Sequence, residues 1–135
     1  MRNKKTWVYS PQKQKPKTTA ILKEWLKSRA DKYIGSTLKP KHVKKVPKDH
    51  KYNYLSDIYS KWHGRFFYIC GVFSCPGPNA LSPSFDAKIA RFEFVADKRF
   101  DVAYMRHTGQ WYLLYEDIDI EEAFSIIEDS PHFFP

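Results

Sequence analysis

The sequence has little cysteine, little glycine and no long apolar run, and each shortage excludes a class of protein. Two cysteines in 135 residues do not make a disulfide framework, and a chain of this length buries a core without one. Five glycines leave no glycine-rich phosphate-binding loop. No stretch approaches the roughly 20 apolar residues that cross a bilayer, and no signal-peptide core follows the basic N-terminus. We therefore expect a cytoplasmic protein with no membrane partner.

Charge is distributed unevenly along the chain. Residues 1–65 hold 18 basic and 4 acidic residues, a net charge of +14, whereas residues 66–135 hold 5 and 11, a net charge of −6. Such asymmetry indicates either an anionic partner for the first half or attraction between the halves. A solvated lysine-rich surface is the plain alternative.

The first 17 residues mix lysine, glutamine and proline, which predicts a flexible basic N-terminal arm, and residues 18–135 then form a single domain. Within that domain, apolar residues recur at three- and four-residue spacing and predict one amphipathic helix, at Ile21, Leu22, Trp25, Leu26, Ala30, Tyr33 and Ile34. Thr18 or Thr19 caps its start and Gly35 ends it. Segment 36–51, with six lysines and two prolines, favours an extended basic connection over helix.

From Tyr52 the pattern is that of β-strands. Tyr, Phe, Ile and Val dominate 52–63, 65–73, 87–96, 99–106 and 111–116, and loop 74–84 has three prolines. In 87–96 the alternation puts Ala90, Phe92 and Phe94 on one face and Arg91 and Glu93 on the other, and in 111–116 it puts Trp111, Leu113 and Tyr115 together. "HTGQ", residues 107–110, reads as a hairpin loop in which Gly109 takes a positive φ. Asp119 and Glu122 then cap a helix whose apolar stripe is Ile120, Ala123, Phe124 and Ile127.

We therefore predict an α+β fold, an antiparallel meander of about five strands with an N-terminal and a C-terminal helix on one face. Aromatic residues make up 17% of the chain and occupy both faces of several strands. The face away from the helices consequently needs a cover, which loop 74–84, the N-terminal arm, a ligand or a second copy of the chain would supply.

Two stretches carry a resemblance: "KDHKYNYLSDIYSKWHGRFFYICGVFSCPGPNALSPSF", residues 48–85, and "RFDVAYMRHTGQW", residues 99–111. Together they resemble a family of small uncharacterised bacterial proteins in which an acidic helix and a Phe-rich tail follow. The resemblance implies a single intracellular domain and transfers no catalytic residue and no cofactor. Separately, "TGQWYLL" is similar to a hairpin of cystatin-like, NTF2-like domains, although the helix after the last strand departs from their order.

Metal binding and catalysis have few candidate residues. Cys70 and Cys75 with His63 and His107 would supply four zinc ligands, but the predicted strand places Cys70 on a face with Phe66 and Tyr68, where cysteine is commonly a small buried apolar residue. Motifs of zinc proteases, serine hydrolases and EF-hands are missing. We expect no metal, no cofactor and no catalytic residue. A hydrolase-like enzyme using Arg106, His107 and Cys70 is the third hypothesis.

The leading hypothesis is a non-enzymatic domain that binds an anionic partner, most plausibly nucleic acid, because lysines interleave with aromatic residues over 41–68. The residues predicted to bind it are Lys23, Lys27, Lys41, Lys44, Lys45, Lys48, Lys51 and Trp62. The alternative is a ligand-pocket or self-association domain, with a homodimer formed through the aromatic sheet face.

Overall fold

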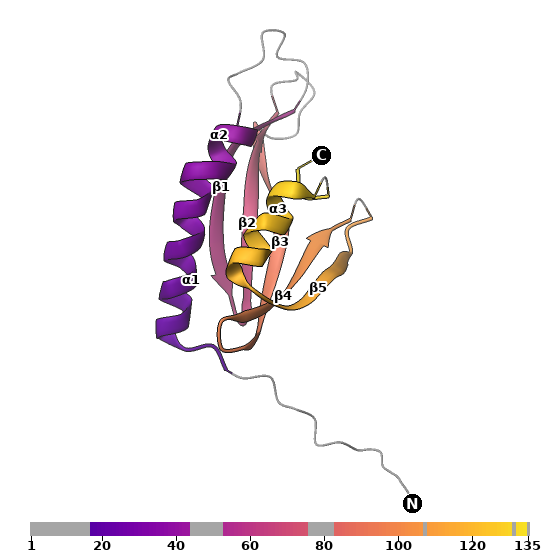
Figure 1. Cartoon of the computed structure of the whole chain (residues 1–135). Coiled ribbons are helices and arrows are strands. Elements are labelled where there is room, and N and C mark those ends of the chain that lie inside the picture. Colours follow the sequence, from indigo (N-terminus) through magenta and orange to yellow (C-terminus); the bar gives the residue numbers. More distant parts are fainter. Residues whose placement is uncertain (1–16, 44–52, 76–82, 107, 131, 135) are drawn as a thin grey trace, which may run out of the picture.

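The computed structural model describes residues 17–43, 53–75, 83–106, 108–130 and 132–134, and within them five strands form one antiparallel sheet. Each strand pairs with its neighbours in sequence, in the order β1 (Tyr54–His63), β2 (Phe66–Ser74), β3 (Ser84–Ala96), β4 (Arg99–Met105) and β5 (Trp111–Asp119). The helices before and after the strands pack on one face of the sheet (Figure 1). The α+β meander predicted from sequence is confirmed.

The N-terminal helical segment begins with α1 (Ala20–Tyr33), where Thr19 Oγ1 accepts a hydrogen bond from the Leu22 N–H at 3.1 Å. The buried residues of this segment recur at four-residue spacing: Leu22, Leu26, Ala30, Ile34 and Leu38. Ile21 was predicted to share the apolar stripe but is 82% exposed. A helix that touches its sheet along one narrow line buries only this i, i+4 row, so the neighbouring position turns outward.

The prediction that this helix ends at Gly35 is wrong. The chain continues as the π-helix η1 (Ile34–Leu38) and then as α2 (Lys39–His42), so residues 36–42 are helical rather than extended. In a regular α-helix the Pro40 ring would meet the carbonyl group four residues back. In the π turn, the Lys39 N–H bonds to the carbonyl of Ile34, which lies five residues earlier instead of four. This wider turn leaves room for the proline ring.

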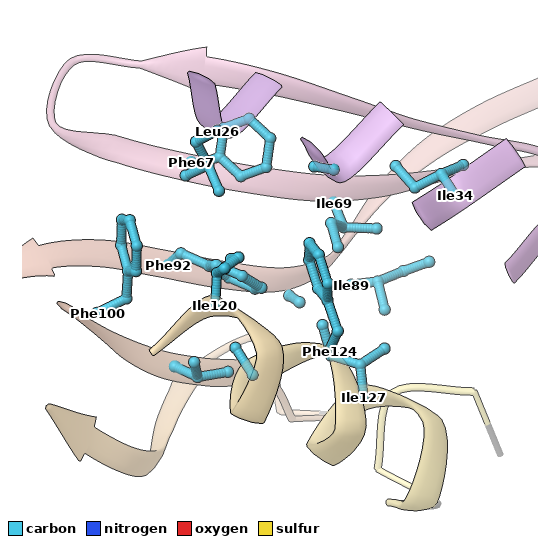
Figure 2. Packing of buried hydrophobic residues seen from close by; sticks show 14 of the residues in the cluster. Leu26, Ile34, Phe67, Ile69, Ile89, Phe92, Phe100, Ile120, Phe124 and Ile127 are labelled. Carbon is cyan, nitrogen blue, oxygen red and sulfur yellow. The ribbon is translucent and has the colours of Figure 1, made fainter. Parts of the chain in front are cut away.

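The core lies between the helices and the sheet, and aromatic rings from adjacent strands form its floor. The centroids of Phe67 and Phe92 lie 6.1 Å apart, those of Phe92 and Phe100 lie 6.3 Å apart, and all three side chains are fully buried. Leu26 of α1 and Phe124 of the C-terminal helix enter the same apolar layer (Figure 2). Fully burying each such ring is worth about 1.5–3 kcal/mol.

The C-terminal helix α3 (Ile120–Asp129) follows β5 directly. Its capping residue was predicted correctly, since Asp119 Oδ1 accepts a hydrogen bond from the Glu122 N–H at 2.8 Å. The predicted stripe is buried at all four positions, Ile120, Ala123, Phe124 and Ile127. Tyr33 stacks on Phe124 with centroids 4.2 Å apart, which joins α1 to α3. Burial and the nearby Glu128 carboxylate raise the pKa of the Tyr33 hydroxyl.

The last hairpin is built as predicted at its turn but not along β5. Gly109 has a φ of 83°, and the Arg106 N–H bonds to the Gln110 carbonyl at 2.9 Å. The pairing register shifts within β4 and β5, so that Leu113 faces Ala103 while Tyr115 faces Val102. Leu113 and Tyr115, predicted to share a face, therefore point to opposite sides of the sheet, because the extra residue between them breaks the alternation.

Several sequence-based predictions fall outside the described residues. These are the flexible arm as far as residue 16, the greater part of loop 74–84, His107, and the lysines at 44, 45, 48 and 51.

Candidate functional site

The sheet face turned away from the helices, called the open face below, is where basic and aromatic side chains meet. Side chains of paired residues point to the same side of a sheet, and the pairing aligns one row across all five strands: Lys61, Tyr68, Arg91, Ala103 and Leu113. A second row runs through Tyr59, Cys70 and Lys88.

Two cations of the open face lie on aromatic rings. The Arg91 guanidinium carbon is 4.7 Å from the centroid of Phe66 and 4.9 Å from that of Trp111. The Lys88 ammonium is 4.6 Å from the centroid of Tyr68. Each such contact is worth about 0.5–2 kcal/mol, and together they fix a layer of rings and cations on the sheet.

This layer accounts for the burial of side chains that no helix covers. Tyr68, Cys70 and Ala103 are 6%, 1% and 2% exposed, although they lie on the side opposite α1 and α3. The stems of long basic side chains cover apolar surface while the charged ends stay in water. The long basic side chains therefore supply part of the cover that this face needs.

Within the described chain, the carboxylates of the open face are bonded but three of its cations have no carboxylate within ion-pair distance. Glu93 pairs with Arg65 at 3.2 Å, and Asp86 accepts a hydrogen bond from the Tyr59 hydroxyl at 2.5 Å. That bond raises the pKa of Tyr59, since it stabilises the protonated phenol beside a carboxylate. The cations left without an acidic partner are Lys61, Lys88 and Arg91.

Two of the lysines predicted to bind nucleic acid, Lys27 of the helix and Lys41 of the segment predicted as extended, contact other parts of the fold. Lys27 Nζ bonds to the Ser60 carbonyl at 2.8 Å and pairs with Asp31 at 3.0 Å. Lys41 Nζ lies 3.4 Å from the Glu128 carbonyl at the end of α3.

Trp62 likewise joins α1 to β1. Its indole N–H donates to the Lys23 carbonyl at 3.0 Å, its ring packs edge-on against Phe67, and the Lys23 ammonium lies 5.6 Å from its centroid. A tryptophan held in this way is part of the helix–sheet interface.

The structure gives Arg106 and Cys70 separate surroundings. Arg106 lies at the β4–β5 turn with its guanidinium carbon 5.5 Å from the centroid of Tyr112. Cys70 lies in the middle of β2, where burial raises the pKa of its thiol and disfavours the nucleophilic thiolate. Both cysteines are free thiols, and in the described part of the chain no three His, Cys, Asp or Glu side chains gather as a metal site.

Sequence reasoning did not single out Lys61, Lys88 and Arg91 together. The alternation of 87–96 placed Arg91 on the outer side of its strand, and this was the available signal. The register shift opposite Cys70 brings Lys88 to the open face as well, and such bulges are not visible in a residue pattern.

Comparison with known proteins addresses the family of the chain. A family model described as a domain of unknown function (DUF3024) matches residues 10–135. The chain belongs to the DUF3024 family. No curated protein and no solved structure matches it. The match confirms the resemblance to an uncharacterised small-protein family, and it also includes the N-terminal helical segment, which precedes the two stretches that carried the resemblance. No helix in the described ranges of this DUF3024 chain is long and apolar enough to cross a membrane.

Proposed function

We propose that this domain binds single-stranded nucleic acid on the open face of its sheet. The observation that carries the proposal is the group formed by Lys61, Lys88 and Arg91, which has no acidic partner in the described chain and lies among Phe66, Tyr68 and Trp111. Lysine and arginine neutralise phosphates, and aromatic rings and guanidinium planes stack on unpaired bases.

A single strand suits this surface better than a duplex. The cations and rings lie in rows across β-strands, on a broad sheet face rather than on a helix or ribbon that would enter the major groove. Stacking on rings further requires bases that are not already paired and stacked. Because phosphate contacts carry no base information, we expect weak sequence preference.

Fluorescence anisotropy with labelled oligo-dT and oligo-rU tests this proposal. Trp111→Ala should weaken binding by about 1–3 kcal/mol if the indole stacks on a base. Arg91→Gln should lower the steepness of the salt dependence by about 0.7 in the log–log slope, the value for one phosphate on a single strand. Arg29→Gln is the matched control, because Arg29 pairs with Glu121 on the helix side.

The outcomes separate the competing hypotheses. No binding at low salt would overturn the proposal. Binding that Arg91→Gln and Trp111→Ala leave unchanged would move the site away from the open face, toward the lysines at 44, 45, 48 and 51. Sedimentation of each variant is needed alongside, because a change in self-association would also alter anisotropy.

A further inference from the structure

A cavity of about 460 Å³ lies on the helix side of the sheet, where α2, three strands and the C-terminal tail meet. It is lined by Leu55, Phe73, Ile89, Phe133, Phe134, Lys41 and His42. The volume falls within the range of small-molecule sites, and the lining is mostly apolar with few polar groups, as in such sites. None of these lining residues is acidic.

The floor of the cavity is made possible by Gly71 in β2. A Cβ atom at this position would lie 2.8 Å from Leu55 Cδ1, 2.9 Å from Ile89 Cδ1 and 3.2 Å from Phe73 Cε2. Side chains from β1, β2 and β3 therefore converge on the one position that has no side chain of its own. Glycine is placed here by close packing, and a central strand tolerates it at some cost in stability.

The wall opposite this floor is aromatic and basic. The His42 ring stacks on Phe134 with centroids 4.1 Å apart and an interplanar angle of 14°. Lys41 is exposed at the rim, and the distance of 3.4 Å from its Nζ to the Glu128 carbonyl oxygen is longer than in a good hydrogen bond. An ammonium group has three donors, so Lys41 retains donors for a ligand.

We propose that this cavity binds a small monocarboxylic acid with an aromatic or branched apolar body. The body lies on Leu55, Phe73 and Ile89, and the carboxylate bonds to the Lys41 ammonium. One lysine at the rim of a mostly apolar site matches one negative charge, whereas a phosphate dianion would keep an unpaired charge next to apolar walls. The site lies across the sheet from the open face and is independent of the proposed nucleic-acid function.

The test is an NMR titration of the full chain with 4-phenylbutyrate and with its neutral analogue 4-phenylbutanamide. We expect saturable shifts of the Leu55 and Ile89 methyl signals, with the acid binding at least about tenfold tighter than the amide, as a charge-assisted hydrogen bond would give. Lys41→Met should abolish that preference and keep binding of the amide. Lys32→Met, an exposed lysine of α1, is the matched control and should keep the preference.

Gly71→Ala probes the cavity itself, because a methyl group there pushes the floor side chains into the space. It should remove binding of both probes. If that variant does not fold, two other results test the proposal. These are the position of the shifted methyl signals in the unaltered chain and the loss of the preference for the acid in Lys41→Met. The proposal is overturned if the shifts do not saturate, if they lie elsewhere, or if acid and amide bind equally. Arg91→Gln should leave phenylbutyrate binding unchanged, so this site and the open face succeed or fail separately.

Discussion

Gly109 and Gly71 are needed for different physical reasons. At Gly109 the backbone has a φ of 83°, and a Cβ would meet nothing within 4 Å, so only the backbone conformation disfavours a side chain. At Gly71 the φ is ordinary and the neighbouring side chains fill the space. The first requirement was recognisable from the turn sequence "HTGQ", whereas the second depends on contacts between three strands and has no local signal.

Gly109→Ala should destabilise the fold by about 1 kcal/mol or more, because an L-residue at this φ carries steric strain. Gly35→Ala is the matched control, since Gly35 is also open to solvent but helical, and it should stabilise by about 0.5–1 kcal/mol. Urea denaturation of the two variants measures both. A Gly109→Ala midpoint equal to that of the unaltered chain would show that the turn relaxes to another geometry.

Among the elements, α1 is held on β1 by polar contacts as well as by its apolar row. Ser60 is 3% exposed, and its hydroxyl donates to Asp31 Oδ1 at 2.5 Å while accepting from Lys27 Nζ at 3.0 Å. These bonds satisfy a buried hydroxyl that would otherwise cost about 1–3 kcal/mol. They also fix the helix along the strand direction, which apolar contacts alone do not.

Trp62→Phe should cost about 1 kcal/mol of stability, because it removes the hydrogen bond to the Lys23 carbonyl. Trp111→Phe, the same exchange on the open face, should cost less, since Trp111 is not bonded to the helix. Denaturation midpoints of the two variants give this comparison. A Trp62→Phe variant of unchanged stability but weaker oligonucleotide binding would support the stacking role first predicted for Trp62.

The strength of the contact between α2 and β1 should depend on pH. The hydrogen bond from Lys39, which pairs with Asp57 at 3.0 Å, lowers the pKa of the Asp57 carboxyl in the folded state. The stability it contributes is therefore present above the unfolded pKa of about 3.9 and is lost as pH falls through the lower folded value.

Asp57→Asn should thus cost less than about 1 kcal/mol at neutral pH, since the pair is half-exposed, and the cost should shrink as pH falls below the unfolded pKa of about 3.9. Denaturation of both proteins across this range, with Lys39→Gln as the partner variant, measures the effect. A difference that persists at low pH would assign it to packing instead.

Sequence-based prediction succeeded in the elements whose apolar residues keep one regular spacing from end to end. The alternation of Ala90, Phe92 and Phe94 and the stripe of α3 were predicted residue by residue. Predictions failed where one residue is inserted into a regular pattern, at the π turn before Lys39 and at the bulge between Leu113 and Tyr115. Such insertions are stabilised by contacts with other elements, so local propensity does not reveal them.

On the scale of the molecule, the two charged halves partly neutralise each other. Among the described residues, ion pairs join Arg29 to Glu121 and Arg65 to Glu93, and each links a cation of the first half to a carboxylate of the second. The sequence therefore predicted which kinds of residue form the candidate site, but it did not predict where in the fold they lie. Sequence indicated an excess of lysine beside aromatic residues, while pairing within the fold determines which cations remain without carboxylate partners.

The segment 44–52, with four lysines and one aspartate, holds much of the remaining positive charge. It connects α2 to β1, since Val43 and Asn53 are the described residues on either side of it. If the lysines at 44, 45 and 48 each neutralise one phosphate of a strand lying on the open face, replacing all three by alanine should reduce the salt slope by about two units. Lys17, Lys32 and Lys98 replaced together change the net charge equally and make the matched control.

Binding measured from about 50 to 200 mM salt gives both slopes. A smaller slope for the 44, 45 and 48 variant, with the control unchanged, would show local phosphate contacts, because a loss of general attraction would affect both variants alike. An equal fall in both would mean that net charge steers the partner without contact from these lysines. An unchanged slope in the first variant, together with loss of binding in Arg91→Gln, would confine the contacts to the open face.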